Sequence, residues 1–206
     1  ETAGDYYDFI PMPNNCIGLV VGDVTGHGIG PALLMAETRA YLRILAGENS
    51  DVGQILTRAN RVLNEDIGSE HFVTLLFVML DPKARTICYA SAGHPPGLWL
   101  DRKGKPKPEL PRTGIPLGLR PDTEYEASEE FLLKKGDLLA LMTDGVEESI
   151  SAQGELFGKK RIMQMLVDKQ SARASKIVAH LHQAGRDYEA ADQQPDDFTT
   201  IVLKVK

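Results

Sequence analysis

Residues 16–30 read CIGLVVGDVTGHGIG, an apolar run that passes directly into a glycine-rich segment around one aspartate. The run 16–21 is short and rich in Val, Ile and Leu, which favours a buried strand. Residues 22–30 contain four glycines, so they predict a loop in which backbone carbonyls can approach a ligand closely. Residues 32–46 have a helix-forming composition. The stretch therefore predicts a strand, a loop and a helix, with Asp23 at the end of the strand.

Similar patterns recur along the rest of the chain. Apolar runs at 6–10 and 16–21, separated by a turn rich in Pro and Asn, predict a hairpin. Asp51 can cap a second helix that ends near Ile67, because its apolar residues recur at helical spacing. Further strands are expected at 72–80, 86–92, 98–100, 131–133, 138–142 and 198–205, and further helices at 159–167 and 174–188.

Two connections between these strands stand out. Residues 101–121 predict a long surface loop, with an excursion at Gly114–Gly118 that touches the core. The Lys-Lys-Gly-Asp turn between the runs 131–133 and 138–142 predicts another hairpin. A basic cluster in the long loop is interpreted as a solvated face, and comprises Arg102, Lys103, Lys105 and Lys107.

The order of elements and the composition restrict the class of protein. Strands joined by hairpins, with helices grouped apart from them, favour an α+β fold with mainly antiparallel sheets. No linker separates the 206 residues, so one domain covering 1–206 is expected, as the C-terminal output part of a longer regulatory protein. The content of 42% hydrophobic and 25% charged residues excludes a disordered tail.

Charge and cysteine content point to a cytoplasmic protein that binds neither nucleic acid nor membrane. The net charge is −6, so the basic footprint of a nucleic-acid-binding protein is absent. No apolar run approaches the ~18 residues that a membrane span needs. The two cysteines, Cys16 and Cys88, lie in apolar runs and are expected to be buried and reduced.

Several aspartates share one context, the point where an apolar run meets a turn. They are Asp5, Asp23, Asp144, Asp196 and Asp197. Each alone could be a turn or cap residue. If they converge, two carboxylates ~4 Å apart repel by roughly 4 kcal/mol at an effective dielectric constant of ~20. Mg²⁺ or Mn²⁺ would relieve that repulsion, and two such ions sharing an aspartate could activate a water to hydrolyse a phosphate ester.

Six short motifs in chain order extend this pattern. They are Gly4-Asp5-Tyr6-Tyr7-Asp8-Phe9, Gly22-Asp23-Val24-Thr25-Gly26-His27-Gly28, Ser91-Ala92-Gly93-His94-Pro95-Pro96, Gly114-Ile115-Pro116-Leu117-Gly118, Thr143-Asp144-Gly145-Val146 and Asp196-Asp197-Phe198-Thr199. The ordered set resembles the SpoIIE/RsbU branch of the bacterial metal-dependent (PPM-type) serine/threonine phosphatases. The resemblance implies a four-layer α-β-β-α sandwich, with two mainly antiparallel sheets flanked by helices, and a site for two divalent cations, Mn²⁺ or Mg²⁺.

The resemblance also implies roles for individual ligands. Asp23 should bridge both ions, with Asp5 and the Val24 carbonyl on one of them. Asp144 and Asp196 should hold the other ion. Three further residues are expected to support these ligands: Asp8, Gly145 and Asp197. Either Asp8 or Asp197 could instead replace the neighbouring aspartate as the ligand.

The implied activity is hydrolysis of a phosphoserine or phosphothreonine protein, often a STAS-type anti-anti-sigma partner. A metal-bridging hydroxide would attack phosphorus directly, so Asp23 and Asp144 would act through metal-bound water. His27 and His94 could each assist as a proton donor or serve only in loop structure. The helices 31–46 and 51–67 could form a movable regulatory element or plain core. A homodimer could form through a region upstream of residue 1.

Two other classes of protein stay open. A GHKL-type ATP-binding kinase or anti-sigma domain carries an Asp-x-Gly-x-Gly box. The residues from Asp23 to Gly28 resemble this box but contain one additional residue. A catalytically weak interaction module on the phosphatase fold would lack metal ligands, whereas all four expected aspartates are present here.

Overall fold

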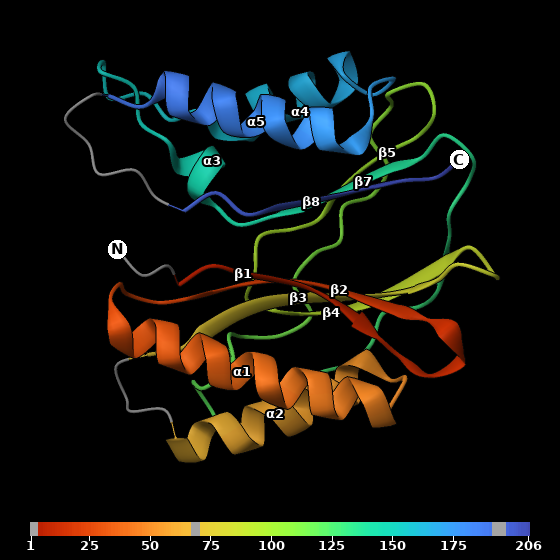
Figure 1. Cartoon of the computed structure of the whole chain (residues 1–206), viewed down its shortest axis with the longest axis vertical. Coiled ribbons are helices and arrows are strands. Elements are labelled where there is room, and N and C mark those ends of the chain that lie inside the picture. The colour runs from red at the N-terminus through yellow and green to blue at the C-terminus, as the bar shows by residue number, and fades with distance from the viewer. Residues whose placement is uncertain (1–3, 67–70, 191–196) are drawn as a thin grey trace. The chain divides into compact units, whose positions relative to one another are not determined.

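The computed structural model describes residues 4–66, 71–190 and 197–206. The chain divides into two compact units (Figure 1). Unit 1 comprises Glu1–Pro96 and Leu110–Leu133, and unit 2 comprises Gly97–Glu109 and Lys134–Lys206. Neither unit is a single stretch of sequence, because the chain leaves unit 1 after Pro96 and returns to it at Leu110. The single-domain organisation stays a prediction.

Unit 1 contains a five-stranded antiparallel sheet with the strand order β1-β2-β3-β4-β6. Its strands are β1 (Tyr6–Pro11), β2 (Ile17–Val24), β3 (Val73–Asp81), β4 (Thr86–Ala92) and β6 (Phe131–Leu132). A 3₁₀ turn, η1 (Pro13–Asn15), joins the first two strands, so the predicted N-terminal hairpin is confirmed. In β1, buried and exposed residues alternate, because successive side chains of a strand point to opposite faces.

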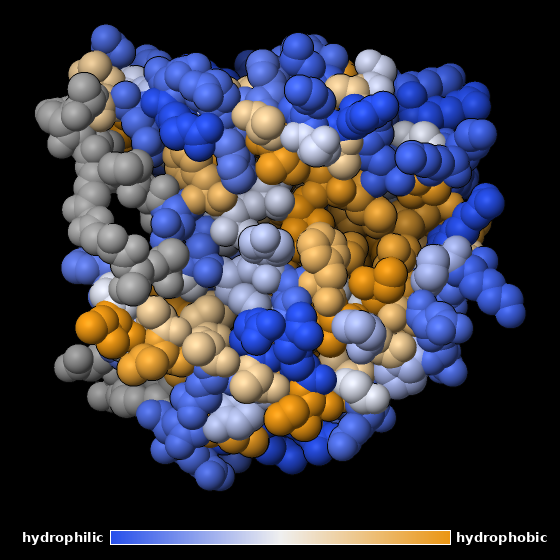
Figure 2. Space-filling view, viewed as in Figure 1, coloured by the Kyte–Doolittle hydropathy of each residue, from blue (hydrophilic) through white to orange (hydrophobic). Residues whose placement is uncertain are grey.

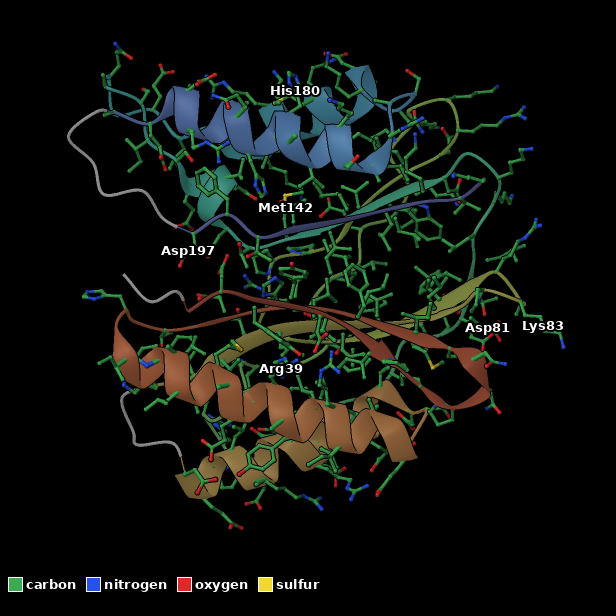
Figure 3. All side chains as sticks on the ribbon, viewed as in Figure 1. Arg39, Asp81, Lys83, Met142, His180 and Asp197 are labelled. Carbon is green, nitrogen blue, oxygen red and sulfur yellow. The ribbon has the colours of Figure 1, made fainter. Side chains whose placement is uncertain are left out.

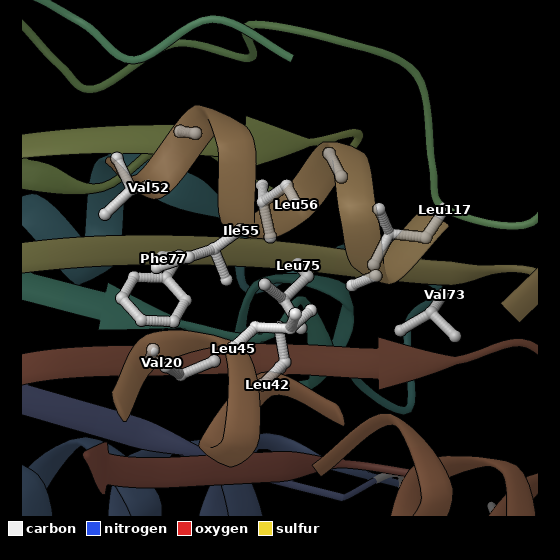
Figure 4. Close-up of a cluster of buried hydrophobic side chains, with 14 of the residues drawn as sticks. Val20, Leu42, Leu45, Val52, Ile55, Leu56, Val73, Leu75, Phe77 and Leu117 are labelled. Carbon is white, nitrogen blue, oxygen red and sulfur yellow. The ribbon is translucent and has the colours of Figure 1, made fainter. Parts of the chain in front are cut away.

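Two helices, α1 (Ile29–Glu48) and α2 (Val52–Asp66), pack on this sheet (Figure 1). The apolar residues of α2 recur at helical spacing, and those that are buried include Val52, Ile55, Leu56, Ala59 and Leu63. They meet β3 residues such as Leu75 and Phe77 in one core (Figure 4). Asp51 caps α2 as predicted, since its Oδ1 accepts the N–H groups of Gly53 (2.9 Å) and Gln54 (3.1 Å).

Unit 2 contains a three-stranded antiparallel sheet with the order β5-β7-β8. Its strands are β5 (Leu98–Leu100), β7 (Leu138–Met142) and β8 (Thr200–Lys204). Its helices are α3 (Gly145–Glu148), α4 (Gly158–Asp168) and α5 (Ala174–Tyr188), of which α4 and α5 lie at the positions predicted from the sequence. Apolar side chains of the sheet and helices form a second core, whose fully buried members include Leu100, Leu138, Ile162 and Leu166.

The predicted hairpin of residues 131–133 and 138–142 is wrong. The turn itself forms, because the Asp137 N–H donates to the Lys134 carbonyl (2.9 Å). However, β6 pairs with β4 in unit 1, whereas β7 pairs with β5 and β8 in unit 2. A turn signal reports only local backbone geometry, whereas strand partners are set by contacts between residues distant in sequence.

The glycine-rich loop is shorter than predicted from its composition. β2 continues to Val24, because Asp23 pairs with Thr74 and Val24 pairs with Val73 of β3. Helix α1 begins at Ile29, before Pro31. The excursion of the long loop into the core is confirmed, since Leu117 is fully buried and exchanges two backbone hydrogen bonds with Val73 (2.8 and 3.0 Å).

Both cysteines, Cys16 and Cys88, are buried and free, as predicted. Burial is the main cause that raises the pKa of the Cys88 thiol to about 11, so this thiol is protonated at neutral pH. Among the helices in the described ranges, none combines the length and the apolar character that crossing a bilayer requires.

Candidate metal centre

In unit 1 the predicted ligands lie at the start of β1 and the end of β2. The Val24 N–H donates to the Gly4 carbonyl (3.3 Å), which fixes the segment before Asp5 against β2. A Cβ on Gly4 would lie 2.7 Å from the Val24 carbonyl oxygen and 2.9 Å from Asp23 Oδ1. Only glycine permits this approach. The structure therefore brings the backbone next to Asp5 against two of the predicted ligand groups.

The loop after β2 is held by residues that precede β3. The Thr25 N–H donates to the Phe72 carbonyl (3.1 Å), and the Phe72 N–H donates to Thr25 Oγ1 (3.1 Å). His71 lies beside them, with its Nδ1 3.2 Å from the Thr25 carbonyl oxygen. No sequence pattern pointed to His71, because a lone histidine before a strand belongs to no motif. His27 is exposed on the same loop.

In unit 2, Asp144 follows β7 and directly precedes the short helix α3. The residue after β7 is hydrogen-bonded to the residue before β8. The Thr143 N–H donates to the Thr199 carbonyl (3.1 Å), and the Thr199 N–H donates to Thr143 Oγ1 (3.2 Å). A Cβ on Gly145 would overlap the carbonyl oxygen of Asp197. The structure thus places the backbone of Asp197, which is labelled in Figure 3, beside that of Gly145, the residue after Asp144.

The aromatic side chain of Phe198 fixes the position of the segment that contains Asp197. The Phe198 ring packs against α5, where a Cβ on Gly185 would lie 2.8 Å from the ring. The His182 ring makes an edge contact with Phe198 (6.1 Å between centroids), and its Nε2 lies 3.2 Å from Thr200 Oγ1. Burial is the main cause that lowers the pKa of His182, which favours a neutral imidazole in this contact.

Asp8 is held on the face of β1 that α1 covers. Its Oδ2 lies 2.6 Å from Arg43 Nε and its Oδ1 2.5 Å from Arg43 Nη2, and the Tyr6 hydroxyl donates to Oδ2 (2.8 Å). Arg39 of α1 adds a longer ion pair at 3.6 Å (Figure 3). Asp8 therefore joins β1 to α1. Its expected supporting role toward the metal ligands stays a prediction.

His94 is fully buried in the turn after β4. Its Nδ1 lies 2.9 Å from Thr74 Oγ1, and its carbonyl accepts a hydrogen bond from Arg112 Nε (3.2 Å). Thr74 is also the residue that pairs with Asp23 across the sheet. These contacts join His94 to the residue that faces Asp23, and its role as a proton donor or a loop residue stays a prediction.

The donor groups fit hard divalent cations, because all of them are carboxylate or carbonyl oxygens. Asp5, Asp23 and Asp144 are each partly buried, so water can still reach them. Asp196 lies outside the described residues. Among the residues that are described, no group of three or more His, Cys, Asp and Glu side chains is close enough to hold one ion.

The comparison with protein families supplies an independent finding. The family described as Stage II sporulation protein E (SpoIIE) matches residues 13–206. The chain belongs to the SpoIIE family. This confirms the resemblance of the six motifs to SpoIIE/RsbU-type PPM phosphatase domains, which are metal-dependent.

Relatives and solved structures agree with this assignment. The SpoIIE-family chain is 29% identical over 206 residues to phosphoserine phosphatase RsbU of Bacillus subtilis (strain 168), and the match covers 100% of this chain and 60% of RsbU. The matches to two further relatives cover 36% and 50% of those proteins. The chain therefore spans less than two thirds of the length of each of these three relatives.

Among solved structures, the SiaA-PP2C domain of Pseudomonas aeruginosa matches with a TM-score of 0.84 and 23% identity, over 99% of this chain and 81% of that one. RsbX, solved in complex with magnesium, matches with a TM-score of 0.70 and 20% identity, over 98% and 87% of the two chains. These matches confirm the predicted α+β sandwich class.

Proposed function

We propose that this chain is the catalytic domain of a protein serine/threonine phosphatase that depends on two divalent cations. The observation that carries the proposal is the close contact of Gly4 with Asp23 and the Val24 carbonyl, in a chain of the SpoIIE family. A side chain at residue 4 would displace two oxygen donors of the strand-end motif, so the backbone there is shaped around them.

The proposed ligands are the oxygen donors that the motif resemblance implies. Asp5, Asp23 and the Val24 carbonyl would hold one cation, and Asp23, Asp144 and Asp196 would hold the other. Asp197 and Gly145 support Asp144, since their backbones are in contact. When bound, the cations supply an acidified water for attack on phosphorus and positive charge for the phosphoryl oxygens.

The chain's own residues hold these donors in place. The Gly4 carbonyl fixes the backbone of Val24 by accepting its N–H. The paired hydrogen bonds of Thr143 and Thr199 fix the backbone on which Asp144 is carried. Metal geometry tolerates only small displacements of oxygen ligands, so such backbone restraints are required for activity.

The substrate we propose is a phosphoserine or phosphothreonine in a STAS-type partner protein. The motif resemblance supports this choice, and RsbU is itself named a phosphoserine phosphatase. Mn²⁺ and Mg²⁺ both suit the donor set, and RsbX was solved with magnesium. A reducing cytoplasm is the proposed location, supported by the two buried free cysteines.

The test is hydrolysis of p-nitrophenyl phosphate and of a phosphoserine protein in the presence of Mn²⁺. Asp23→Asn and Asp144→Asn should each lower kcat/KM by at least about a hundredfold, because each removes a proposed ligand. Asp122→Asn is the control: it also removes one negative charge, but from an exposed loop of unit 1, and it should retain the wild-type rate.

Two outcomes would overturn this proposal. One is near-normal hydrolysis by either ligand variant. The other is calorimetric binding of ATP without metal, which the GHKL-type alternative expects and the phosphatase does not.

A further inference from the structure

A cavity of about 990 Å³ lies in unit 2, away from the candidate metal ligands of that unit. Four segments line it: the loop at 102–103, Gly136, the connection at 167–175 and the chain at 204–206. Gly136 precedes β7 and Lys204 ends β8, whereas Asp144 follows β7 and Asp197 precedes β8. The cavity and these aspartates therefore lie at opposite ends of the same two strands. A strand of five residues, such as β8, is about 17 Å long.

The lining is strongly basic, although the whole chain has a net charge of −6. Its basic side chains are Arg102, Lys103, Arg173, Lys204 and Lys206. Asp168 is the acidic side chain of the lining, and its Oδ1 accepts a hydrogen bond from Gln164 (2.8 Å). Within the described part of the chain, the ion pairs do not include Arg102, Lys103 or Arg173. Like charges gathered in this way repel one another, and a bound anion would relieve the repulsion.

The basic residues of the long loop were expected to form one solvated face, but two of them differ from Lys107 in their contacts. Lys107 is engaged elsewhere, because its Nζ lies 2.6 Å from Asp137 Oδ2 and 3.7 Å from the centroid of the Trp99 ring. Arg102 and Lys103 instead line the cavity. Arg102 and Lys103 therefore have different surroundings from Lys107.

Hydrogen bonds join the segments that line the cavity. Lys204 Nζ donates to the carbonyls of Gln170 (2.6 Å) and Ala172, and Gln170 Nε2 donates to the Gly136 carbonyl (3.3 Å). Helix α5 begins at the cavity, and no side chain caps its N-terminus at Arg173. The first N–H groups of this 15-residue helix add donors and a positive dipole end to the five cationic side chains.

The volume and the lining define the class of ligand. A cavity of about 990 Å³ has the size of a small-molecule site. Its lining contains no aromatic side chain on which a nucleobase could stack. In Figure 2, hydrophilic residues cover the surface over the start of α5. We propose that this cavity binds a small soluble polyanion with two or more phosphate groups, recognised through its charge and phosphoryl oxygens.

The test is calorimetric titration of the metal-free chain with sodium pyrophosphate, with inorganic phosphate as a second probe. Pyrophosphate should bind at least about tenfold more tightly than phosphate, because it reaches more of the cationic groups. The variant Lys103→Gln/Arg173→Gln should weaken pyrophosphate binding at least about tenfold. The matched control Lys83→Gln/Lys160→Gln removes two exposed lysines outside the cavity and should change the affinity less than about twofold.

Three results would overturn the proposal: no binding of pyrophosphate at millimolar concentration, equal affinity for both probes, or equal weakening in the two double variants. Asp23→Asn provides a further discrimination. Pyrophosphate binding to the metal-free chain should be unchanged by this substitution, because without cations the carboxylates of the candidate metal centre repel a polyanion. Loss of binding in this variant would overturn the cavity as the site. Loss of phosphatase activity alone would leave the binding result intact, so the two proposals fail separately.

Discussion

Asp8 and Asp5 lie three residues apart, yet their surroundings differ because Asp8 points to the face of β1 under α1. Burial alone would raise the pKa of Asp8, but hydrogen bonds from Arg43, Tyr6 and the Phe9 N–H outweigh it and lower the pKa below its usual 3.8. The Tyr6 phenol has a raised pKa, mainly through burial and then through its bond to Asp8. Asp8 is therefore ionised and paired at neutral pH, which favours a structural role.

Replacing Asp8 by Asn should lower the unfolding free energy at pH 7 by about 2 kcal/mol. This is less than the roughly 3–5 kcal/mol for breaking a fully buried pair, because the Arg43 side chain is 39% exposed. Asp8 has a lowered pKa in the folded state, so its stabilisation is present above about pH 4 and is lost as pH falls through the folded value.

Urea unfolding at pH 7 and pH 3 measures this prediction. The wild type and Asp8→Asn should differ at pH 7 and converge toward pH 3. Asp66→Asn is the control, since Asp66 makes an exposed hydrogen bond with Tyr41 (3.1 Å) and its loss should cost less than about 0.5 kcal/mol. A difference that is constant with pH would contradict the ion-pair explanation.

Gly4→Ala should weaken Mn²⁺ binding by about tenfold or more. The added methyl group would lie within 3 Å of both Asp23 Oδ1 and the Val24 carbonyl oxygen, so one of these proposed ligands must move. Gly30→Ala is the control, because a Cβ there would meet nothing within 4 Å. Titration calorimetry with Mn²⁺ compares the two, and equal affinities would show that Gly4 does not shape the site.

The two helices of unit 1 differ in how their ends are stabilised. Helix α2 has a side-chain cap in Asp51, whereas α1 begins after Gly28 (φ +96°) without one. Helix α1 is instead joined to β1 through Arg43 and Asp8. A displacement of α1 would therefore be transmitted to the strand that follows Asp5. This coupling makes the two helices suitable for a regulatory role, which stays a proposal.

Asp51→Ala should destabilise the chain by about 1 kcal/mol, because it removes the acceptor for two N–H groups at the start of α2. Asp51→Ser keeps a capping oxygen and should restore most of that stability. Urea midpoints with an unchanged slope are the measurement. Equal loss in both variants would show that charge, rather than capping, accounts for the effect.

Cations that bind the folded chain and not the unfolded chain should raise its stability. Mn²⁺ at a hundred times its dissociation constant should add about 2.7 kcal/mol. For a chain of this size that corresponds to a rise in Tm of about 5–10 °C. Melting curves with Mn²⁺ and after EDTA measure the difference. A metal-loaded sample whose curve is unchanged by EDTA would contradict the cation site.

Most elements of this protein follow from local sequence. Helical spacing and the capping residue Asp51 marked α2. Helices α4 and α5 lie where the sequence predicted helices, and apolar runs marked nearly all the strands. These features depend on neighbours within a few residues, so a linear pattern contains them. The motif order likewise predicted the SpoIIE family, which is confirmed. The aspartates of the candidate ligand set stay a prediction.

Other properties depend on contacts between residues far apart in the chain. The turn before β7 is a local feature, yet the pairing of β6 with β4 is not. The pairing of Asp8 with Arg43, the contact of His71 with the loop after β2, and the basic cavity of unit 2 likewise join distant segments. Sequence patterns specify which residues are buried or exposed. Register and packing then decide which groups meet, because a shift of one residue turns a side chain to the other face of a strand.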